Sequence, residues 1–295
     1  MKNIAIIGAG TMGVGIAHVF AQHKYKVQLI DKNETLLKKG LETIAFNLDR
    51  LIAKQKITPE LKTQTLLNIN GTTNLKEAVK NADLVIEAIT EQLEQKLALF
   101  KLLDTYTAEK AILATNTSSI SITKIASVVT KPERVIGMHF MNPVPIMPLV
   151  EVIKGYNTSL EVVNTITKVA QNINKVTVQV NDYPGFVANR ILMPMINEAI
   201  ETLYTGVTGV KEIDAVMTLG MAHPMGPLQL ADFIGLDVCL SILNIMHTTF
   251  KSPKYVACPL LVKMVEAGKL GVKSKEGFYN YTKHKKAEQV AKQFT

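Results

Sequence analysis

Tryptophan is absent from the sequence, and cysteine occurs only at Cys239 and Cys258 among 295 residues. Two cysteines cannot form the disulfide framework of a small secreted protein, and neither belongs to a Cys-x-x-Cys or Cys/His spacing that binds a metal ion. No apolar run is long enough to span a membrane, and Met1 precedes an apolar strand rather than a signal-peptide pattern. We therefore expect a cytoplasmic protein with no metal site and no membrane partner.

Aromatic residues are also scarce, at 6% of the chain, although the net charge is +8. Proteins that bind single-stranded nucleic acid combine basic grooves with aromatic side chains on which bases stack. Here the lysines are dispersed, and the densest basic cluster, residues 283–286, is predicted to be a solvated part of the C-terminal tail. We expect no nucleic-acid partner, because a small polyanionic substrate or cofactor explains the positive charge equally well.

The length of the chain exceeds what one hydrophobic core usually organises, so we expect two domains. In residues 1–182 short apolar runs alternate with helical patterns, which is typical of a parallel α/β sheet wound on both faces. An amphipathic helical hairpin, residues 33–56 and a helix beginning at Pro59, is expected after the second strand. The expected strands are residues 3–7, 26–30, 82–88, 111–116, 134–140, 149–153 and 176–180.

The turn-rich segment 181–185 predicts a linker, and the pattern of residues 183–295 after it is helical. Several helices of this second domain are apolar around most of their circumference and therefore need a partner surface. We predict an all-α domain through which two copies of the chain form a homodimer.

A glycine-rich motif, GAGTMG, follows the first strand and opens a helix. In this context the first glycine permits a tight turn, the second lets a pyrophosphate approach the backbone, and the third allows close packing of helix and strand. The second strand ends at Asp31, where a carboxylate can bind the adenosine ribose hydroxyls and repel a 2′-phosphate. The pattern predicts a dinucleotide site that prefers NAD over NADP. Its residues are Gly8, Gly10, Thr11, Met12, Gly13 and Asp31.

His139 lies near the end of one apolar strand, and Glu151 lies in the next. The connection between the strands, NPVPIMP, contains three prolines that forbid a helix. An imidazole held by a carboxylate has a fixed tautomer and a stabilised charged form, as a general base requires. From these residues alone, a catalytic pair and a structural ion pair are equally good interpretations.

Other polar residues follow strands of the same predicted sheet. Ligands bind beyond the carboxyl ends of strands in such sheets, and this rule gathers Glu91, Asn116, Ser118 and His139 along one edge with the glycine loop. Each residue singly has a structural explanation, as a cap, an Asx turn or a first-turn acid. Their common placement favours a functional site.

Five segments together carry a resemblance to a known family: GAGTMGVG, the NTSS run, HFMNPVPIMPLVEVI, PGFVANRIL and HPMGPLQLADFIGLD. In this order and spacing the chain resembles the 3-hydroxyacyl-CoA dehydrogenases over essentially its whole length, and looks most like the short bacterial 3-hydroxybutyryl-CoA dehydrogenases. The resemblance implies a Rossmann-type domain, a helical dimerising domain, and reversible NAD-linked oxidation of an (S)-3-hydroxyacyl-CoA. Met141 and Pro148 stand where phenylalanine and lysine are usual in the family, so the preferred acyl length is left open.

The resemblance also implies roles for individual residues. His139 is the expected general base and Glu151 its orienting partner, while Ser118 and Asn189 are expected to contact the substrate. Arg50 and Lys54 are the expected partners of the CoA phosphates. The implied NAD contacts beyond the glycine motif are Glu91, Lys96, Asn116, Asn142 and Lys273.

Two other interpretations stay open at this point. The first keeps NAD and the His–Glu pair but uses a CoA-free hydroxy acid, as sugar-acid dehydrogenases related to this family do. The second is a non-catalytic role, because lens crystallins of the same fold serve structurally; the presence of all four catalytic residue types argues against it.

Overall fold

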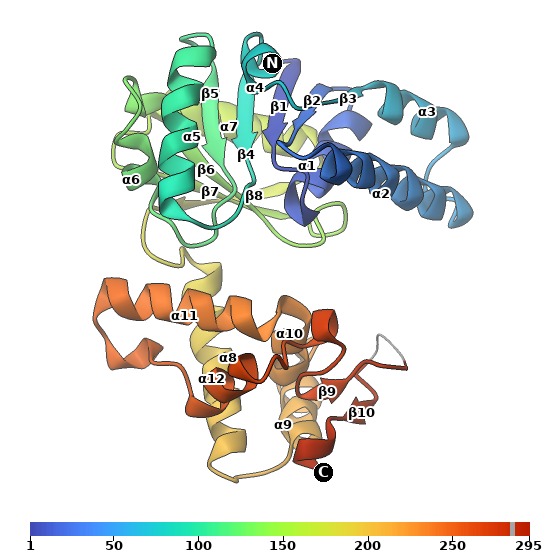
Figure 1. Cartoon of the computed structure of the whole chain (residues 1–295), viewed down its shortest axis with the longest axis vertical. Coiled ribbons are helices and arrows are strands. Elements are labelled where there is room, and N and C mark those ends of the chain that lie inside the picture. The colour runs from blue at the N-terminus through green and yellow to red at the C-terminus, as the bar shows by residue number, and fades with distance from the viewer. Residues whose placement is uncertain (284–286) are drawn as a thin grey trace. The chain divides into compact units, whose positions relative to one another are not determined.

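The fold is described from a computed structural model, which covers residues 1–283 and 287–295. Residues 284–286, most of the predicted basic tail cluster, lie outside the described residues. The chain forms two compact units, Met1–Tyr183 (unit 1) and Pro184–Thr295 (unit 2), coloured blue to yellow-green and yellow to red in Figure 1. Each unit has its own hydrophobic core.

Unit 1 is built on an eight-stranded sheet in the order β3-β2-β1-β4-β5-β6-β7-β8. The strands from β3 through β6 are parallel to their neighbours, but β7 pairs antiparallel with β6, and β8 runs parallel to β7. The expected parallel sheet is confirmed for most of its strands; β7 departs from it because the β6–β7 connection is too short for a crossover helix. The strands are β1 (Asn3–Ile7), β2 (Lys26–Ile30), β3 (Ile69–Thr72), β4 (Leu84–Glu87), β5 (Ile112–Thr115), β6 (Val135–Phe140), β7 (Leu149–Lys154) and β8 (Val176–Asn181).

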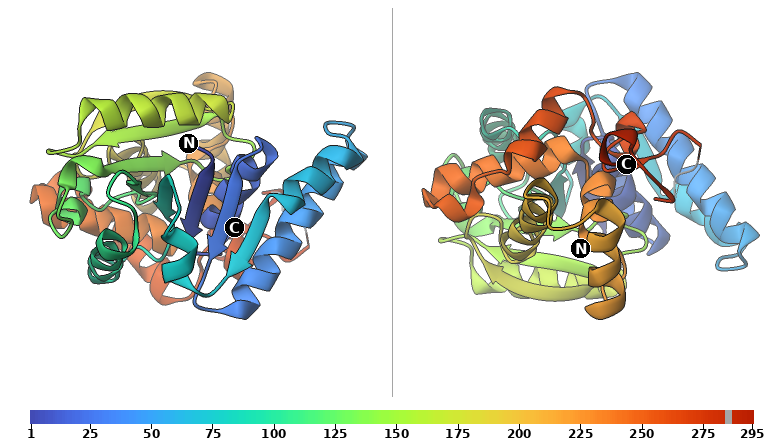
Figure 2. Two further views of the ribbon diagram at one scale, coloured as in Figure 1. Left: turned by 90° about the horizontal axis from the view of Figure 1, so that it is seen from above. Right: turned by 90° about the horizontal axis from the view of Figure 1, so that it is seen from below.

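Helices cover both faces of this sheet, with α5 and α7 on opposite sides in Figures 1 and 2. The predicted hairpin is present: Asn33 caps α2, and Thr58 caps α3 with Pro59 in the first turn. The sequence did not predict β3 or α4. The helices are α1 (Thr11–Gln22), α2 (Glu34–Ala53), α3 (Pro59–Leu67), α4 (Leu75–Val79), α5 (Leu93–Tyr106), α6 (Ile122–Ala126) and α7 (Leu160–Asn172).

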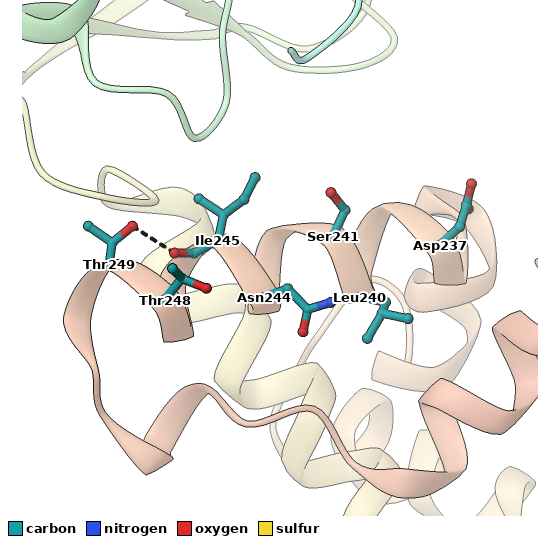
Figure 3. Close-up of a pocket in the computed structure, with 7 residues that line it drawn as sticks. All are labelled: Asp237, Leu240, Ser241, Asn244, Ile245, Thr248 and Thr249. Atoms are coloured by element: carbon teal, nitrogen blue, oxygen red, sulfur yellow. Dashed lines mark hydrogen bonds between the residues drawn. The ribbon is translucent and has the colours of Figure 1, made fainter. Parts of the chain in front are cut away.

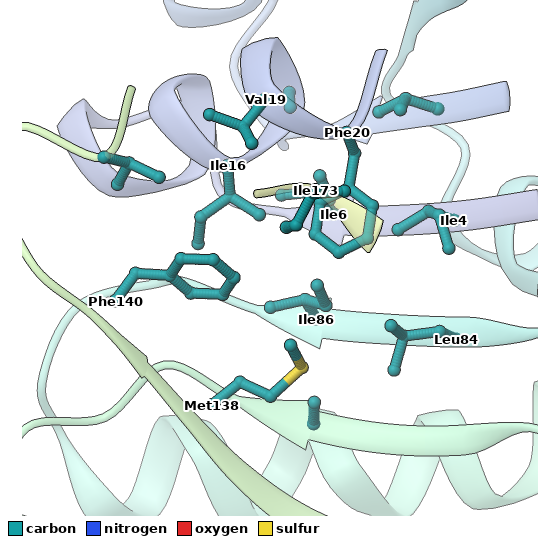
Figure 4. Packing of buried hydrophobic residues seen from close by; sticks show 14 of the residues in the cluster. Ile4, Ile6, Ile16, Val19, Phe20, Leu84, Ile86, Met138, Phe140 and Ile173 are labelled. Carbon is teal, nitrogen blue, oxygen red and sulfur yellow. The ribbon is translucent and has the colours of Figure 1, made fainter. Parts of the chain in front are cut away.

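The core of unit 1 fixes α1 against the sheet. Ile16 and Phe20 of α1 are fully buried and pack among side chains from β1, β4 and β6 (Figure 4). Met138 and Phe140 of β6 belong to this cluster. Because side chains alternate across a strand, His139 between them points to the opposite face of the sheet.

Unit 2 is a helical bundle with a small addition of strand. The helix α8 (Ala188–Tyr204) continues through Pro194, and α9 (Val210–Ala215) is followed by a π-helical turn at Val216–Gly220. The bundle is completed by α10 (Pro227–Ile234), α11 (Leu236–Phe250) and α12 (Pro259–Glu266), and a two-stranded antiparallel pair joins β9 (Tyr279–Asn280) to β10 (Gln289–Val290). In the described part of the chain no single helix is long and apolar enough to cross a membrane. Taken together, α10 and α11 have sufficient length and apolar composition, but a 94° bend separates them.

Two buried carboxylates tie the last segment of unit 2 to the bundle. Asp232 accepts hydrogen bonds from the backbone N–H groups of Phe278 and Tyr279, at 3.0 and 2.9 Å. Asp214 accepts from the Tyr279 hydroxyl at 2.8 Å and from the first turn of α10 through the Leu228 N–H at 2.8 Å. Burial raises the pKa of both groups, that of Asp232 to about 6.

Candidate active site

His139 and Glu151 are opposite each other on the antiparallel strands β6 and β7. The imidazole Nδ1 lies 2.7 Å from a carboxylate oxygen of Glu151. Both residues are buried, with 8% and 2% of their surface exposed. A short hydrogen bond between buried groups fixes the ring orientation and stabilises an imidazolium, so the pair has the geometry of a general base with its orienting partner.

The glycine motif forms a cradle at the carboxyl end of β1. Gly8 has a positive φ of 108°, and a Cβ there would lie 2.5 Å from the Ala88 carbonyl oxygen after β4. A Cβ on Gly13 would collide with the Gly8 carbonyl, whereas a Cβ on Gly10 would meet nothing within 4 Å. The first and third glycines are therefore needed for packing, and the open space at Gly10, beside the first turn of α1 with Thr11 and Met12, is where a pyrophosphate can approach the backbone.

Asp31 completes this cradle at the end of β2. Its carboxylate accepts hydrogen bonds from the N–H groups of Ala9, at 2.8 Å, and Asn33, at 3.0 Å. The bonds hold a negative charge beside the glycine loop. If a dinucleotide were bound, the Asp31 carboxylate would accept hydrogen bonds from its ribose hydroxyls and would repel a 2′-phosphate. The residues present therefore fit NAD.

Glu91 organises the loop that carries Ser118. One carboxylate oxygen accepts hydrogen bonds from the Thr117 hydroxyl at 2.6 Å and from the N–H groups of Ser118 and Ser119 at 2.9 and 3.0 Å. Burial opposes ionisation of Glu91, but the Lys96 ammonium and these donors outweigh it and hold its pKa below the usual range. The structure thus brings Glu91 and Ser118 into direct contact, as their common placement after neighbouring strands suggests.

Lys96 belongs to the same network but lies in the interior, with 1% of its surface exposed. Its ammonium is 2.6 Å from Glu87 and 3.3 Å from Glu91. Glu87 also accepts a hydrogen bond from the Thr115 hydroxyl at 2.7 Å. Its ion pair with Glu91 connects Lys96 to the Ser118 loop.

Asn116 and Asn142 flank the His139 strand. The Asn116 side-chain oxygen accepts a hydrogen bond from the Phe140 N–H at 2.9 Å, which ties the end of β5 to the residue after His139. Asn142 is exposed and precedes Pro143 through a cis peptide bond. Both side chains lie at the carboxyl edge of the sheet.

The remaining predicted residues lie on α2 and in unit 2. Arg50 and Lys54 are exposed at the end of α2, and the Arg50 guanidinium lies 6.0 Å from the centre of the Phe46 ring. Asn189 is buried in the first turn of α8. Lys273 forms an ion pair with Asp237 at the start of α11.

Sequence reasoning did not single out a groove along one face of α11. It has a volume of about 520 Å³ and mixes hydroxyl, amide and apolar side chains (Figure 3). The Thr249 hydroxyl donates a hydrogen bond to the Ile245 carbonyl at 2.7 Å, so this bond lies within α11. Within residues 1–283 and 287–295, no three His, Cys, Asp or Glu side chains are grouped so that they could hold a metal ion.

Two family models match the chain, one for each unit. The model for the NAD binding domain of 3-hydroxyacyl-CoA dehydrogenase matches residues 3–183, and the model for the C-terminal domain of 3-hydroxyacyl-CoA dehydrogenase matches residues 185–281. The chain is 50% identical over 281 residues to the probable 3-hydroxybutyryl-CoA dehydrogenase of Bacillus subtilis, covering 95% of this chain and 98% of the relative. It is also 50% identical over 280 residues to the 3-hydroxybutyryl-CoA dehydrogenase of Clostridioides difficile, with 95% and 99% covered.

Solved structures agree with these matches. The crystal structure of (S)-3-hydroxybutyryl-CoA dehydrogenase from Ralstonia eutropha superimposes with a TM-score of 0.92 at 45% identity, covering 96% of this chain and all of the other.

Proposed function

The chain belongs to the 3-hydroxyacyl-CoA dehydrogenase family, and we propose that it oxidises a short-chain (S)-3-hydroxyacyl-CoA reversibly with NAD, with 3-hydroxybutyryl-CoA and acetoacetyl-CoA as the substrate pair. The observation that carries the proposal is the 2.7 Å contact between His139 and Glu151, on the same sheet whose first strand leads into the dinucleotide cradle. The names of the relatives at 50% identity support the short acyl chain.

His139 has the proton-transfer role in this proposal. Gly8, Gly10, Gly13 and Asp31 would hold NAD, which would supply the acceptor for the hydride that leaves the C3 carbon of the substrate. The hydroxyl proton has to leave at the same time, and Nε2 of His139 accepts it because Nδ1 is engaged by Glu151. Glu151 stabilises the imidazolium that results, and in the reverse direction His139 returns the proton to the ketone oxygen.

Ser118 and Asn189 are proposed as the donors that stabilise the substrate oxygens as their charge changes. The support for Ser118 is its position on the loop that Glu91 holds. The support for Asn189 is the family resemblance, in which PGFVANRIL supplies a substrate-contacting asparagine. Arg50 and Lys54 are proposed to bind the CoA phosphates, as exposed cations on α2.

We extend the proposal to the remaining NAD contacts, to a homodimer and to the compartment. Glu91, Lys96, Asn116, Asn142 and Lys273 are assigned to the cofactor side. The buried Lys96 acts there through its ion pair with Glu91.

The exposed apolar side chains of unit 2, among them Leu219 at 87%, Val207 at 72% and Ile191 at 68%, support an interface between two copies. The two cysteines are free and buried, which suits the reducing cytoplasm.

The test is a comparison of substrates with the purified protein. Oxidation of NADH is followed with acetoacetyl-CoA, with longer 3-ketoacyl-CoAs and with free acetoacetate, and each is repeated with NADPH. We expect the highest kcat/KM for acetoacetyl-CoA with NADH. A strict preference for free acetoacetate would support the CoA-free alternative, and NADH binding without turnover of any acyl-CoA would support a non-catalytic role.

A further inference from the structure

The proline-rich loop 141–148 joins the two strands that carry the catalytic pair. Phe140 ends β6 and Leu149 begins β7, so His139 and Glu151 stand at the base of this loop. The loop turns tightly, because the N–H groups of Ile146 and Met147 both donate to the Pro143 carbonyl, at 2.9 and 3.0 Å. A change in the conformation of this loop would act directly on the ends of both strands.

One side of this loop packs against the helix of the glycine motif. Val144 is 2% exposed, and it faces Gly15 of α1 so closely that a Cβ on Gly15 would lie 2.9 Å from the Val144 Cβ. Because α1 follows the glycine motif directly, this contact connects the loop after His139 to the proposed dinucleotide cradle.

The other side of the loop is held by Lys175, which immediately precedes β8. Its ammonium donates to the carbonyl oxygens of Val144, at 2.5 Å, and Met147, at 2.7 Å. The next residue extends the contact, since the Val176 N–H donates to the Pro148 carbonyl at 2.8 Å. Lys175 is 7% exposed, and burial lowers its pKa.

The bonding partners of Lys175 identify what it does. In the described part of the chain no carboxylate forms an ion pair with it, so the buried charge is stabilised by loop carbonyls rather than by a counter-ion. Burying a cation is unfavourable unless it is hydrogen-bonded, and charge-assisted hydrogen bonds are the strong ones. Removing the ammonium would leave two carbonyl oxygens without their donor.

We propose that Lys175 is a positioning residue for the dehydrogenase reaction, which holds loop 141–148 against Gly15 and so sets the geometry of the catalytic pair relative to the cofactor. The inference rests on the proposed function. Lys175 acts through the loop, which also carries Asn142, and it does not itself take part in proton transfer.

The experiment compares Lys175→Met, which keeps the length of the side chain but removes its donors, with Lys175→Arg, which keeps a cation with donors. Lys168→Met is the matched control, because Lys168 is an exposed lysine on α7 of the same unit. Hydrogen exchange of loop 141–148 is measured in the protein without cofactor, together with the Kd for NADH and with kcat/KM for acetoacetyl-CoA.

For Lys175→Met we expect faster exchange in the loop, unchanged exchange in β1 and β4, weaker NADH binding, and a fall in kcat/KM of about tenfold or more. Lys175→Arg should recover most of the NADH affinity and most of the kcat/KM. Kinetics and loop exchange equal to those of Lys168→Met would overturn the proposal, and so would an even increase of exchange over all of unit 1, which indicates a purely structural role.

A second variant covers the case in which Lys175→Met does not fold. Gly15→Ala places a methyl group against Val144 and displaces the loop from the opposite side. Faster exchange in residues 141–148 with weaker NADH binding would support the proposal, and wild-type NADH binding would contradict it. If the wild-type protein fails to reduce acetoacetyl-CoA, the proposed function fails, while the exchange and NADH measurements still decide the role of Lys175.

Discussion

At the scale of single residues, the candidate site depends on a few polar side chains whose positions are fixed by their neighbours. His139, Glu151 and Glu91 are held by short hydrogen bonds that come from neighbouring strand ends. His18 of α1 is buried too, and burial lowers its pKa to about 4. Substitutions at these positions therefore have distinct expected consequences.

Replacing His139 by glutamine removes the proton acceptor but keeps a polar side chain of similar size. Because general acid–base catalysis typically contributes a hundredfold or more, we expect kcat for acetoacetyl-CoA to fall by about that factor. The Kd for NADH should be unchanged, since the dinucleotide cradle is formed by other residues. Steady-state kinetics and fluorescence titration with NADH measure the two quantities; near-normal turnover would remove His139 from the mechanism.

His18 should make unit 1 sensitive to acid. Its pKa in the folded state, about 4, lies below the ordinary value of 6.5, so the folded state favours the neutral ring. Its contribution to stability is complete above pH 6.5 and is lost as the pH falls towards 4, by about 3 kcal/mol. Urea unfolding at pH 7 and pH 4.5 should show that His18→Leu loses less stability on acidification than the wild type. His23→Gln, at the end of the same helix, is the control; an acid response of His18→Leu equal to that of the wild type would contradict the assignment.

At the scale of elements, the sequence predicts most of unit 1 because its strands are continuous apolar runs and its helices carry cap residues. The strand β1 and the cap Thr58, directly before Pro59, are examples. The pattern does not predict β3 and α4, because β3 is a short, half-exposed edge strand and α4 is a five-residue helix without a long apolar stripe. The direction of β7 is missed because strand periodicity carries no information about pairing partners.

For the candidate site, the sequence predicts that His139 and Glu151 can meet and that the glycine motif follows a strand, and the structure has both features; the roles of these residues stay predictions. The sequence places Glu91 and Ser118 at one edge but does not give the hydrogen bonds that Glu91 accepts from the Ser118 loop, and it gives no indication of the bonds that Lys175 donates to loop 141–148, because their partners are far apart in the chain.

The ion pair between Lys96 and Glu87 joins α5 to the end of β4 inside the protein. Lys96→Met leaves the Glu87 carboxylate buried without its partner, and breaking such a pair is strongly destabilising. We expect the free energy of unfolding to fall by about 3 kcal/mol or more, and Glu87→Gln added to Lys96→Met should restore part of it. Chemical denaturation monitored by circular dichroism provides the comparison; a single variant as stable as the wild type would show that the charge is compensated elsewhere.

At the scale of the whole molecule, the two units should respond to pH in opposite directions. In unit 1 the pKa values of His18, Glu91 and Asp104 are lowered in the folded state, so its stability decreases as the pH falls. In unit 2 burial raises the pKa values of Asp214 and Asp232, so its stability decreases as the pH rises through about 6.

Hydrogen exchange followed by mass spectrometry, corrected for the intrinsic rate at each pH, measures both units in one sample. Between pH 7 and pH 5 we expect protection to decline in the core of unit 1 and to increase in the segment of unit 2 around β9. A parallel decline in both units would contradict the prediction.

The proposed homodimer leads to a further prediction for unit 2. Leu219 is 87% exposed, and Leu219→Asp would place a charge in an apolar interface. We expect this variant to be monomeric by size-exclusion chromatography with light scattering. Leu67→Asp, at an exposed leucine of unit 1, should keep the wild-type mass; a Leu219→Asp variant that remains a dimer would place the interface elsewhere.

The antiparallel turn from β6 to β7 has a consequence for how this scaffold tolerates change. A crossover from β6 to a following parallel strand would need about a dozen residues or more, whereas residues 141–148 alone join β6 to β7 and keep His139 and Glu151 on adjacent strands. Insertions and deletions in the hairpin of α2 and α3, which carries the proposed CoA-binding residues Arg50 and Lys54, would therefore leave the proposed proton-transfer pair intact within the hairpin of β6 and β7.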